Sequence, residues 1–331
     1  MLAHPQPLPL AWEGSFPALT EPPKPLLMRS PAAHIDRLHA SVRGPVWMVI
    51  AGFAFAGIWG LTRAASADVH PFMIVFCRNL FGSIAVVTLA LPAWQRDTLK
   101  RWPIHLRRAG SGIIATYATF YAVSHAPLAT VQAINFAAPL FATVGAALFL
   151  GEKLRARRIG ALLVGFSGVM IVLRPGGVEL TPGILAAIVS AVSTAFSLVA
   201  IKQLVGTDDP RLVAAFTFVL MLPISAVVAP FFWSWPDAGT WVLLVAIGLC
   251  AVVGQVSTSY AFRAADATAV MPYDFLRFGV IAAIGWFAFG ESIDALTLIG
   301  GGVILASSIY LAYREAVAGR GVKPASQPPL T

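Results

Sequence analysis

Charged side chains are scarce in this sequence. Only 11% of its 331 residues are Asp, Glu, Lys or Arg, whereas a soluble domain has about 25%. At the same time, 58% of the residues are hydrophobic and the mean hydropathy is +0.78. Because a soluble body of this size needs polar side chains over its surface, the composition excludes a water-soluble domain and indicates a protein whose main solvent is lipid.

Cysteine and the common catalytic motifs are also nearly absent. The two cysteines, Cys77 and Cys250, lie inside apolar stretches, which argues against a disulfide framework or a metal site. The sequence contains no G-x-x-x-x-G-K-[ST] loop, no H-E-x-x-H pair and no G-x-S-x-G elbow, which mark P-loop ATPases, zinc proteases and serine hydrolases. We therefore expect no enzyme activity, no cofactor, no bound metal and no ATP-driven motor.

Ten apolar segments follow one another from Pro45 onwards. Each is roughly long enough, at 1.5 Å per residue, to cross a hydrocarbon core of about 30 Å. Their continuously apolar character excludes the strands of a membrane barrel, which alternate apolar and polar residues. The predicted membrane helices are 45–61, 69–91, 109–125, 127–150, 159–173, 182–201, 212–232, 240–262, 265–289 and 295–313. Residues 1–44, with eight prolines, are expected to form a disordered cytoplasmic tail, and residues 315–331 a second one.

The net charge of +8 predicts orientation and not nucleic-acid binding. If the N-terminus is cytoplasmic, 19 of the 23 Lys and Arg residues fall in cytoplasmic segments. Arg107 and Arg108 are counted there, while Arg63 and Arg174 remain outside. Positive charges concentrate on the cytoplasmic side of membrane proteins. Both termini are therefore predicted to be cytoplasmic in a bacterial inner (plasma) membrane, with the lipid bilayer as partner and no nucleic acid.

The sequence also resembles itself at an offset of 139 residues. The matching positions include Tyr121 with Tyr260, Val131 with Val270, and Gly151-Glu152 with Gly290-Glu291. Two halves of five membrane helices each must have opposite orientations, because five is odd. The predicted fold is therefore an all-α integral membrane protein of ten transmembrane helices, arranged as two inverted-topology five-helix repeats at 45–174 and 182–314. Such repeats are typical of secondary transporters.

Three ionisable side chains lie deep within apolar segments: Arg78 in the second, and Asp274 and Arg277 in the ninth. A charge at such a depth costs about 2.5–3.5 kcal/mol on insertion scales, so it should face a bundle interior or a wet cavity. Their summed charge of one positive unit favours a site for an anion or an electron-rich polar group. The alternative is a salt-bridge network that locks the second and ninth helices together.

Polar and aromatic side chains near these charges complete the predicted binding site. Tyr121 and Tyr260 occupy equivalent positions in the two halves, and so do Asn135 and Asp274. Rings with polar tips can stack on an organic solute and hydrogen-bond to it, although the same residue types also join helices to one another. The candidate substrate-binding residues are Arg78, Tyr121, Asn135, Tyr260, Asp274 and Arg277.

The motifs that close the two halves resemble those of the drug/metabolite transporter (DMT) superfamily, EamA type. In the first half they are Ala126-Pro127-Leu128, Pro139-Leu140, Leu150-Gly151-Glu152-Lys153-Leu154 and Leu173-Arg174-Pro175-Gly176. The counterpart in the second half is Phe289-Gly290-Glu291. The resemblance covers about residues 45–314. It implies two bundled repeats around a central cavity and the export or uptake of small organic metabolites.

One departure within this resemblance concerns the second half. Phe278 stands where the first half has Pro139, and the stretch Tyr273-Asp274-Phe275-Leu276-Arg277 precedes it. This pattern resembles a subset of the family associated with uptake of riboflavin or S-adenosylmethionine; export of amino acids or drugs is the alternative.

The function expected from these observations is a secondary transporter that moves a small organic metabolite by alternating access. An integral-membrane enzyme and a non-transporting membrane scaffold are the two alternatives from other classes. Coupling to a proton or a counter-solute is a hypothesis, with Asp274 as the candidate protonation site. The direction of transport and the oligomeric state are left open by the sequence.

Overall fold

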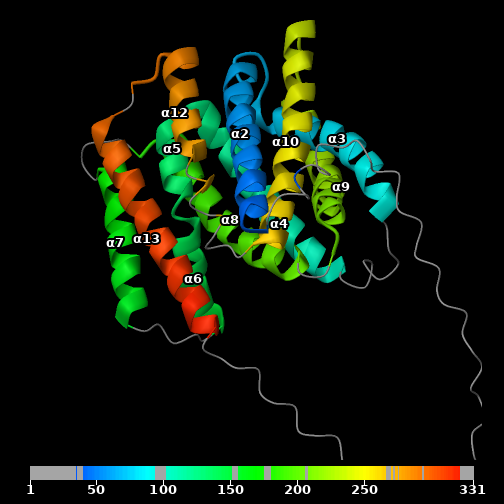
Figure 1. Ribbon diagram of the computed structural model, residues 1–331. Helices are drawn as coiled ribbons and strands as arrows, with labels where there is room; N and C mark the ends of the chain where they lie inside the picture. The colour runs from blue at the N-terminus through cyan, green and yellow to red at the C-terminus, as the bar shows by residue number, and fades with distance from the viewer. Residues whose placement is uncertain are drawn as a thin grey trace, which may run out of the picture. The chain divides into compact units, whose positions relative to one another are not determined.

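The protein is helical throughout the part that the computed structural model describes, which comprises residues 35, 40–93, 102–150, 156–174, 180–205, 208–265, 270, 273, 274, 276–292 and 294–320. All of these except Ile35 belong to the unit His39–Thr331. Its helices (Figure 1) are α2 (Ala40–Ala65), α3 (Pro71–Ala90), η1 (Leu91–Ala93), α4 (Trp102–His125), α5 (Leu128–Asn135), α6 (Ala138–Leu150), α7 (Ala156–Leu173), α8 (Pro182–Val205), α9 (Pro210–Val228), η3 (Ala229–Phe232), α10 (Ala238–Ala264), α12 (Leu276–Phe289) and α13 (Ala295–Arg320). The described residues include no β-strand, so the predicted all-α class is confirmed.

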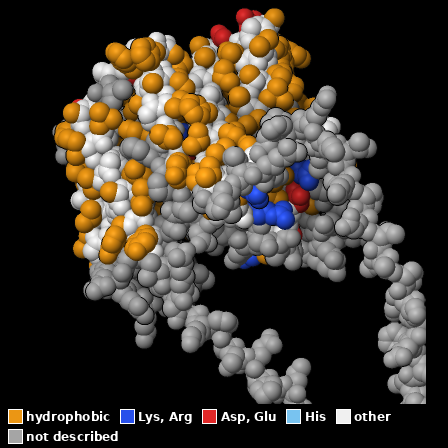
Figure 2. Space-filling model, in the orientation of Figure 1, with side chains coloured by type: hydrophobic (Ala, Val, Ile, Leu, Met, Phe, Trp, Pro, Cys, Tyr) orange, Lys and Arg blue, Asp and Glu red, His pale blue; other side chains and the backbone are white. Residues whose placement is uncertain are grey.

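Several of these helices suit a membrane. Among the described residues, five stretches are long and apolar enough to span one: Val42–Ala65, Pro71–Ala90, Leu128–Gly145, Pro210–Phe232 and Ala238–Ala264. Large apolar side chains point outward from the unit, including Phe231 and Trp235, each 80% exposed. Figure 2 shows hydrophobic side chains over most of the visible described surface. A surface of this kind is stable against lipid tails and not against water.

Several helices extend beyond the predicted segments, because their first or last turns contain charged residues and are nevertheless helical. α2 begins at Ala40 and α13 continues to Arg320, so parts of both predicted tails are helical. α4 begins at Trp102, seven residues before the predicted span. The predicted span 127–150 is two helices, because the chain turns at Phe136 and Ala137 before Pro139, and proline has no N–H to continue the ladder.

Two helices, α3 and α9, begin at a capping residue that is followed by a proline. Pro71 and Pro210 each occupy the first turn of a helix, α3 and α9, where the missing N–H costs nothing. The residue before each proline caps the helix. His70 Nδ1 accepts a hydrogen bond from the backbone N–H of Phe72 (3.2 Å), and Asp209 Oδ1 accepts one from the N–H of Arg211 (2.8 Å). These short side chains fix where the two helices begin.

Small residues allow the helices to approach one another closely. α7 packs along α13, as Figure 1 shows, and the two backbones meet at Gly168 and Gly300. A Cβ atom on Gly168 would lie 2.9 Å from the carbonyl oxygen of Gly300, and one on Gly300 would lie 2.7 Å from the carbonyl oxygen of Gly168. No larger residue fits at this crossing without moving one helix away from the other.

We predict that Gly168→Ala lowers the free energy of unfolding by about 1–3 kcal/mol, the usual cost of overpacking, because a backbone carbonyl cannot rotate aside as a side chain does. The measurement is unfolding of the purified protein in detergent. Gly160→Ala on the same helix is the matched control, since a Cβ atom there meets no atom within 4 Å. It should leave stability unchanged or raise it by up to about 1 kcal/mol through helix propensity. Equal stability of the two variants would contradict the close crossing.

We also predict that protonation of His70 weakens the start of α3. Burial, and next the neighbouring His125, lower the pKa of His70 below its usual 6.5, and a protonated Nδ1 cannot accept the Phe72 N–H. The unfolded chain therefore binds the proton more readily, and the stability contributed by this cap is present above about pH 6.5 and is lost as the pH falls through the lowered pKa. The Tm of the wild type should fall more steeply with acid than that of His70→Asn, which caps without titrating. Parallel pH profiles of the two proteins would rule this out.

Candidate functional site

A cavity of about 290 Å³, open on part of its boundary, lies between helices from both halves of the chain. Most of its wall area is apolar, with side chains contributed by α2, α4, α6, α8, α9, α10 and α13, and hydroxyl side chains on α4, α8, α9, α10 and α13 are part of the lining. Few charged side chains reach it. Among the described residues they are Arg78 on α3, Arg108 on α4, Asp274 two residues before α12, and Arg277 in the first turn of α12. A largely apolar surface into which polar groups converge is the usual form of a small-molecule site.

Four of the six residues predicted as substrate-binding line this cavity together: Arg78, Asn135, Asp274 and Arg277. The two tyrosines are not among its lining residues. Tyr121 stacks on His125 with ring centroids 4.1 Å apart. Tyr260 stacks on Trp47 at 4.9 Å, near the beginning of α2. Their equivalent positions in the two halves thus correspond to two aromatic stacks outside the cavity wall.

Arg78 is held in place from α9. Its side chain is buried, and its guanidinium carbon lies 4.8 Å from the centre of the Phe218 ring, a cation–π distance. One N–H, from Nη1, donates to Asn79 Oδ1 (2.8 Å). The Phe218 ring can lie against α3 because residue 82 is glycine, where a Cβ atom would be 2.6 Å from that ring. Among the described residues no carboxylate pairs with Arg78.

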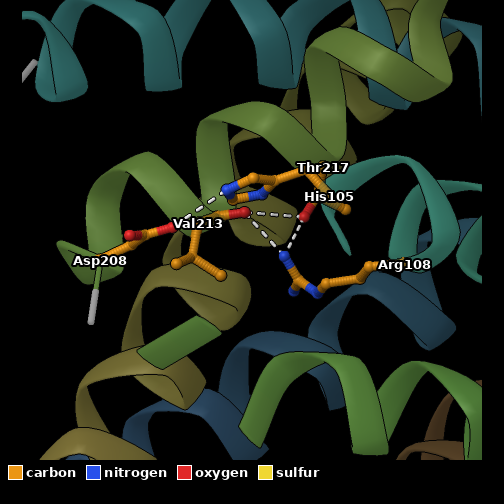
Figure 3. A network of polar contacts seen from close by, with 5 residues as sticks. All are labelled: His105, Arg108, Asp208, Val213 and Thr217. Carbon is orange, nitrogen blue, oxygen red and sulfur yellow. Dashed lines mark hydrogen bonds and ion pairs between the residues drawn. The ribbon is translucent and has the colours of Figure 1, made fainter. Parts of the chain in front are cut away.

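Arg108 is a charged residue of the cavity that was not among the six predicted site residues. It was assigned to a cytoplasmic loop as an orientation signal, and the structure corrects this, because Arg108 is only 4% exposed inside α4. Figure 3 shows its guanidinium directed at α9, where Nη1 donates to the carbonyl oxygen of Val213 (2.6 Å) and to the Thr217 hydroxyl. Nη2 donates to Gln255 Oε1 on α10 (3.1 Å). All three acceptors are neutral.

A helical pattern could have found Arg108. Gly112, Ala115 and Thr119 follow it at intervals of four, three and four residues, and all of them line the cavity. These positions share one face of a helix. Hydropathy placed the boundary between Arg108 and Ala109, because two adjacent arginines resemble the end of a span. One turn earlier, His105 Nε2 lies 3.1 Å from Asp208 Oδ2, both buried, so α4 is tied to the start of α9 at this end as well (Figure 3).

Asp274 and Arg277 form an ion pair within their own segment. Arg277 Nη2 lies 3.1 Å from Asp274 Oδ2, and the Arg277 guanidinium carbon is 5.5 Å from the centre of the Phe55 ring. Asp274 therefore neutralises Arg277 and not Arg78. The alternative of a salt-bridge network that locks the second and ninth helices is not found among the described residues, since Arg78 has no part in this pair.

Asn135 joins three helices at the cavity wall. Its Oδ1 accepts a hydrogen bond from Ser190 Oγ on α8 (2.9 Å), and Ser190 is in turn bonded to Thr119 Oγ1 on α4 (2.5 Å). Its Nδ2 donates to the carbonyl oxygen of Val131 (3.0 Å). Asn135 is the last residue of α5, directly before the turn that separates α5 from α6. The side chain therefore closes a helix end as well as lining the cavity.

The described residues contain no group of three or more His, Cys, Asp or Glu side chains that could hold a metal ion. The cavity charges instead come to an excess of two positive units, from three arginines and one aspartate. A guanidinium in this setting can bind an anion, polarise a carbonyl or stack on a ring. It cannot act as an acid or a base that transfers a proton, because it stays protonated.

Comparison with known sequences gives a family match over most of the chain. The profile of the EamA-like transporter family matches residues 42–174 and again residues 181–313. A "Riboflavin transporter" of Rhizobium johnstonii is 30% identical over 287 residues, which cover 83% of this chain and 92% of the relative. The "Pseudopaline exporter CntI" of Pseudomonas aeruginosa is 30% identical over 273 residues, covering 81% and 95%.

A third relative and a solved structure extend the comparison. An "S-adenosylmethionine uptake transporter" of Rickettsia felis is 26% identical over 282 residues, covering 85% of this chain and 96% of the relative. A solved structure described as "Crystal structure of protein" aligns with a TM-score of 0.56 at 21% identity, over 82% of this chain and 98% of the other. At this identity the structural likeness shows a shared fold and nothing more.

We predict that Thr217→Val destabilises the protein more than a matched threonine replacement does. The valine keeps the shape but removes an acceptor from the buried Arg108 guanidinium, and a hydrogen bond to a charged group contributes about 1.5–3 kcal/mol. Thr143→Val is the control, because the buried Thr143 hydroxyl only donates to the carbonyl oxygen of Pro139 (3.0 Å). Thermal unfolding in detergent measures both. If the two variants lose the same stability, the Thr217 hydroxyl does not hold Arg108.

Proposed function

This chain belongs to the EamA-like transporter family, and we propose that it is a secondary transporter that carries a small organic metabolite across a bacterial inner membrane by alternating access. The observation that carries the proposal is the cavity of about 290 Å³, which is lined by helices of both matched halves and by two arginines that no described carboxylate neutralises. A packed structural core has no reason to retain such charges, whereas a solute pathway does.

Two inverted repeats of five membrane helices are part of this proposal, with bounds at 45–174 and 182–314. The helix contacts support it. The offset pairs α2 with α8, α3 with α9, α4 with α10, α6 with α12 and α7 with α13. If the two halves are exchanged, the α2–α10 contact becomes the α8–α4 contact, and the α2–α12 contact becomes the α8–α6 contact. All four of these contacts are present. The α3–α9 and α7–α13 contacts map onto themselves. A pseudo-two-fold axis produces this pattern.

The capped helix starts agree with the same offset of 139 residues. His70-Pro71 at the start of α3 corresponds to Asp209-Pro210 at the start of α9, and both pairs serve as cap and first helical residue. Under the proposed topology the first start faces the outside and the second faces the cytoplasm. The distribution of Lys and Arg supports cytoplasmic termini, because most of these residues then lie on the cytoplasmic side, as the positive-inside rule expects.

Ion pairs close one end of the bundle. Arg63, at the end of α2, lies 3.2 Å from Glu291, which precedes α13. Arg63 Nη1 also donates to the carbonyl oxygens of Val123 and Ala126, and Glu291 Oε2 accepts the backbone N–H of Leu128. These contacts join the first half to the second at what the proposal makes the outer end, where Arg174 and Asp294 form another pair.

The offset assigns counterparts to this closure at the inner end. Arg63 corresponds to Lys202 and Glu291 to Glu152; Glu152 and the side chain of Lys202 lie outside what the structure describes. Alternating access requires that one end closes when the other opens.

A membrane enzyme and a non-transporting scaffold are the competing functions. An enzyme needs catalytic side chains that transfer protons or act as nucleophiles at the site, and the charged groups lining this cavity are arginines and an aspartate already paired with one of them. Energy coupling through a proton or a counter-solute remains part of the proposal, with Asp274 as the group to test. The relatives' names include both an uptake system and an exporter.

The test is solute counterflow in proteoliposomes with a panel that includes riboflavin and S-adenosylmethionine. We expect protein-dependent exchange of at least one solute without ATP, and a loss of at least about tenfold in Arg78→Ala, as for a group whose charge meets the solute. Arg107→Ala, on the exposed side of α4, should exchange like the wild type. Unchanged exchange by a correctly inserted Arg78→Ala protein would remove the cavity from the pathway.

A further inference from the structure

We propose that the solute is a small organic anion with an apolar, ring-containing body, and that Arg78 and Arg108 together hold its carboxylate or phosphate. This inference rests on the proposed function, since it names the substrate class of the same cavity. It also makes Arg108 a specificity-determining residue. The charge of the cavity, the geometry of the two guanidinium groups and the nature of the remaining walls support this assignment.

The charge of the cavity calls for an anion. Asp274 is paired with Arg277, which leaves Arg78 and Arg108 without a carboxylate among the described residues. Both are 4% exposed, so water solvates them only through the cavity. A neutral or cationic solute that displaced this water would leave two positive charges uncompensated in a low-dielectric interior, whereas an oxyanion would compensate them.

The two guanidinium groups are anchored and still have hydrogen-bond capacity. A guanidinium has five N–H donors. Those of Arg78 make one hydrogen bond, to Asn79, within the described part of the chain, and the rest of the group lines the cavity. Arg108 is fixed by neutral acceptors on α9 (Figure 3) and by Gln255 on α10. Planar forks of this kind match the paired oxygens of carboxylates and phosphates.

Consecutive residues of one helix position both groups. Thr217 accepts from Arg108, and the ring of Phe218 lies beneath Arg78. Phe218 is fully buried and Thr217 nearly so, and two neighbouring residues of an α-helix hold a fixed separation and angle. The two cations therefore reach the cavity from α3 and α4 with a set spacing, so they do not have to be ordered when an anion binds.

Part of the remaining wall suits an apolar ring, and hydroxyl side chains on α4, α8, α10 and α13 line other parts of it. Phe55 and Trp59 on α2, Phe120 on α4, Phe136 before α6 and Phe262 on α10 all line the cavity. Aromatic side chains in such number bury flat apolar surface and stack with a ring. An inorganic anion would satisfy the arginines but leave these walls in contact with water. The combination favours an amphipathic anion over phosphate or sulfate alone.

Five probes of related size separate these features: benzoate, phenyl phosphate, benzyl alcohol, benzylamine and inorganic sulfate. Binding to the purified full-length protein in detergent is measured by titration calorimetry. We expect benzoate or phenyl phosphate to bind at least about tenfold more tightly than benzyl alcohol, benzylamine and sulfate. Tighter binding of the alcohol or the amine would overturn the anionic class. Equal binding of sulfate and the better ring anion would overturn the ring-containing body, and the two ring anions distinguish a carboxylate from a phosphate.

Three variants test the assignment to Arg108. Arg108→Gln should lose at least about tenfold in affinity for the preferred ring anion without weakening benzyl alcohol. Arg108→Lys should fall between that variant and the wild type, because it keeps the charge without the fork. Arg107→Gln, whose side chain is exposed on the adjacent position, should bind as the wild type. If Arg108→Gln does not fold, Arg108→Lys decides, and wild-type affinity for the anion in that variant would overturn the role of the fork.

The failure of this inference can be told from the failure of the proposed function. If counterflow carries a neutral or cationic solute while neither ring anion binds or competes, the protein transports and the substrate class is wrong. If a ring anion binds with the expected selectivity but neither it nor any other solute of the panel crosses the membrane, the anion site stands and the transport proposal is wrong.

Discussion

The structure depends on the inability of hydrocarbon to solvate a polar group. Every backbone N–H and C=O within the bilayer must therefore be satisfied by the protein, which requires helices, and every charge must turn inward. This constraint explains why Arg78 and Arg108 both end in one cavity although they come from different helices. It also explains the choice of their partners, because a ring, an amide, a hydroxyl and a carbonyl oxygen stabilise a guanidinium without neutralising it.

α9 organises the site. Thr217 and Phe218 position the two arginines, and the helices that carry those arginines approach α9 through glycines. Gly82 accepts the Phe218 ring against α3, and Gly112 accepts the methyl group of Met221 against α4. The start of α9 is fixed by the Asp209 cap, one residue after the Asp208 carboxylate that meets His105. The contacts of Asp208 and Asp209 at the start of α9 thus help to set the positions of Thr217 and Phe218, which lie about two to three helical turns later.

Much of this could be predicted from the sequence, and the failures have physical causes. Continuous apolar runs predict helices because no other element crosses a bilayer alone, and an isolated arginine such as Arg78 within a run predicts an interior site. Arg108 was not predicted at the site because hydropathy averages over all faces of a helix. Two adjacent arginines then indicate the end of a membrane span, even though only Arg107 is exposed. Tyr121 and Tyr260 were placed at the site by equivalence between the halves. Equivalence fixes depth in the membrane but not the direction of a side chain, and both rings stack on neighbours instead.

The glycine crossing of α7 and α13 has a mechanical consequence. Two helices whose backbones touch at Gly168 and Gly300 cannot slide along each other, since the carbonyl of each fills the space where a side chain on the other would stand. These two helices contribute the last element of each matched half. The close crossing therefore joins the last helix of one matched half to the last helix of the other through their backbones, so that sliding of one helix along the other would bring a carbonyl oxygen into contact with the facing side chains.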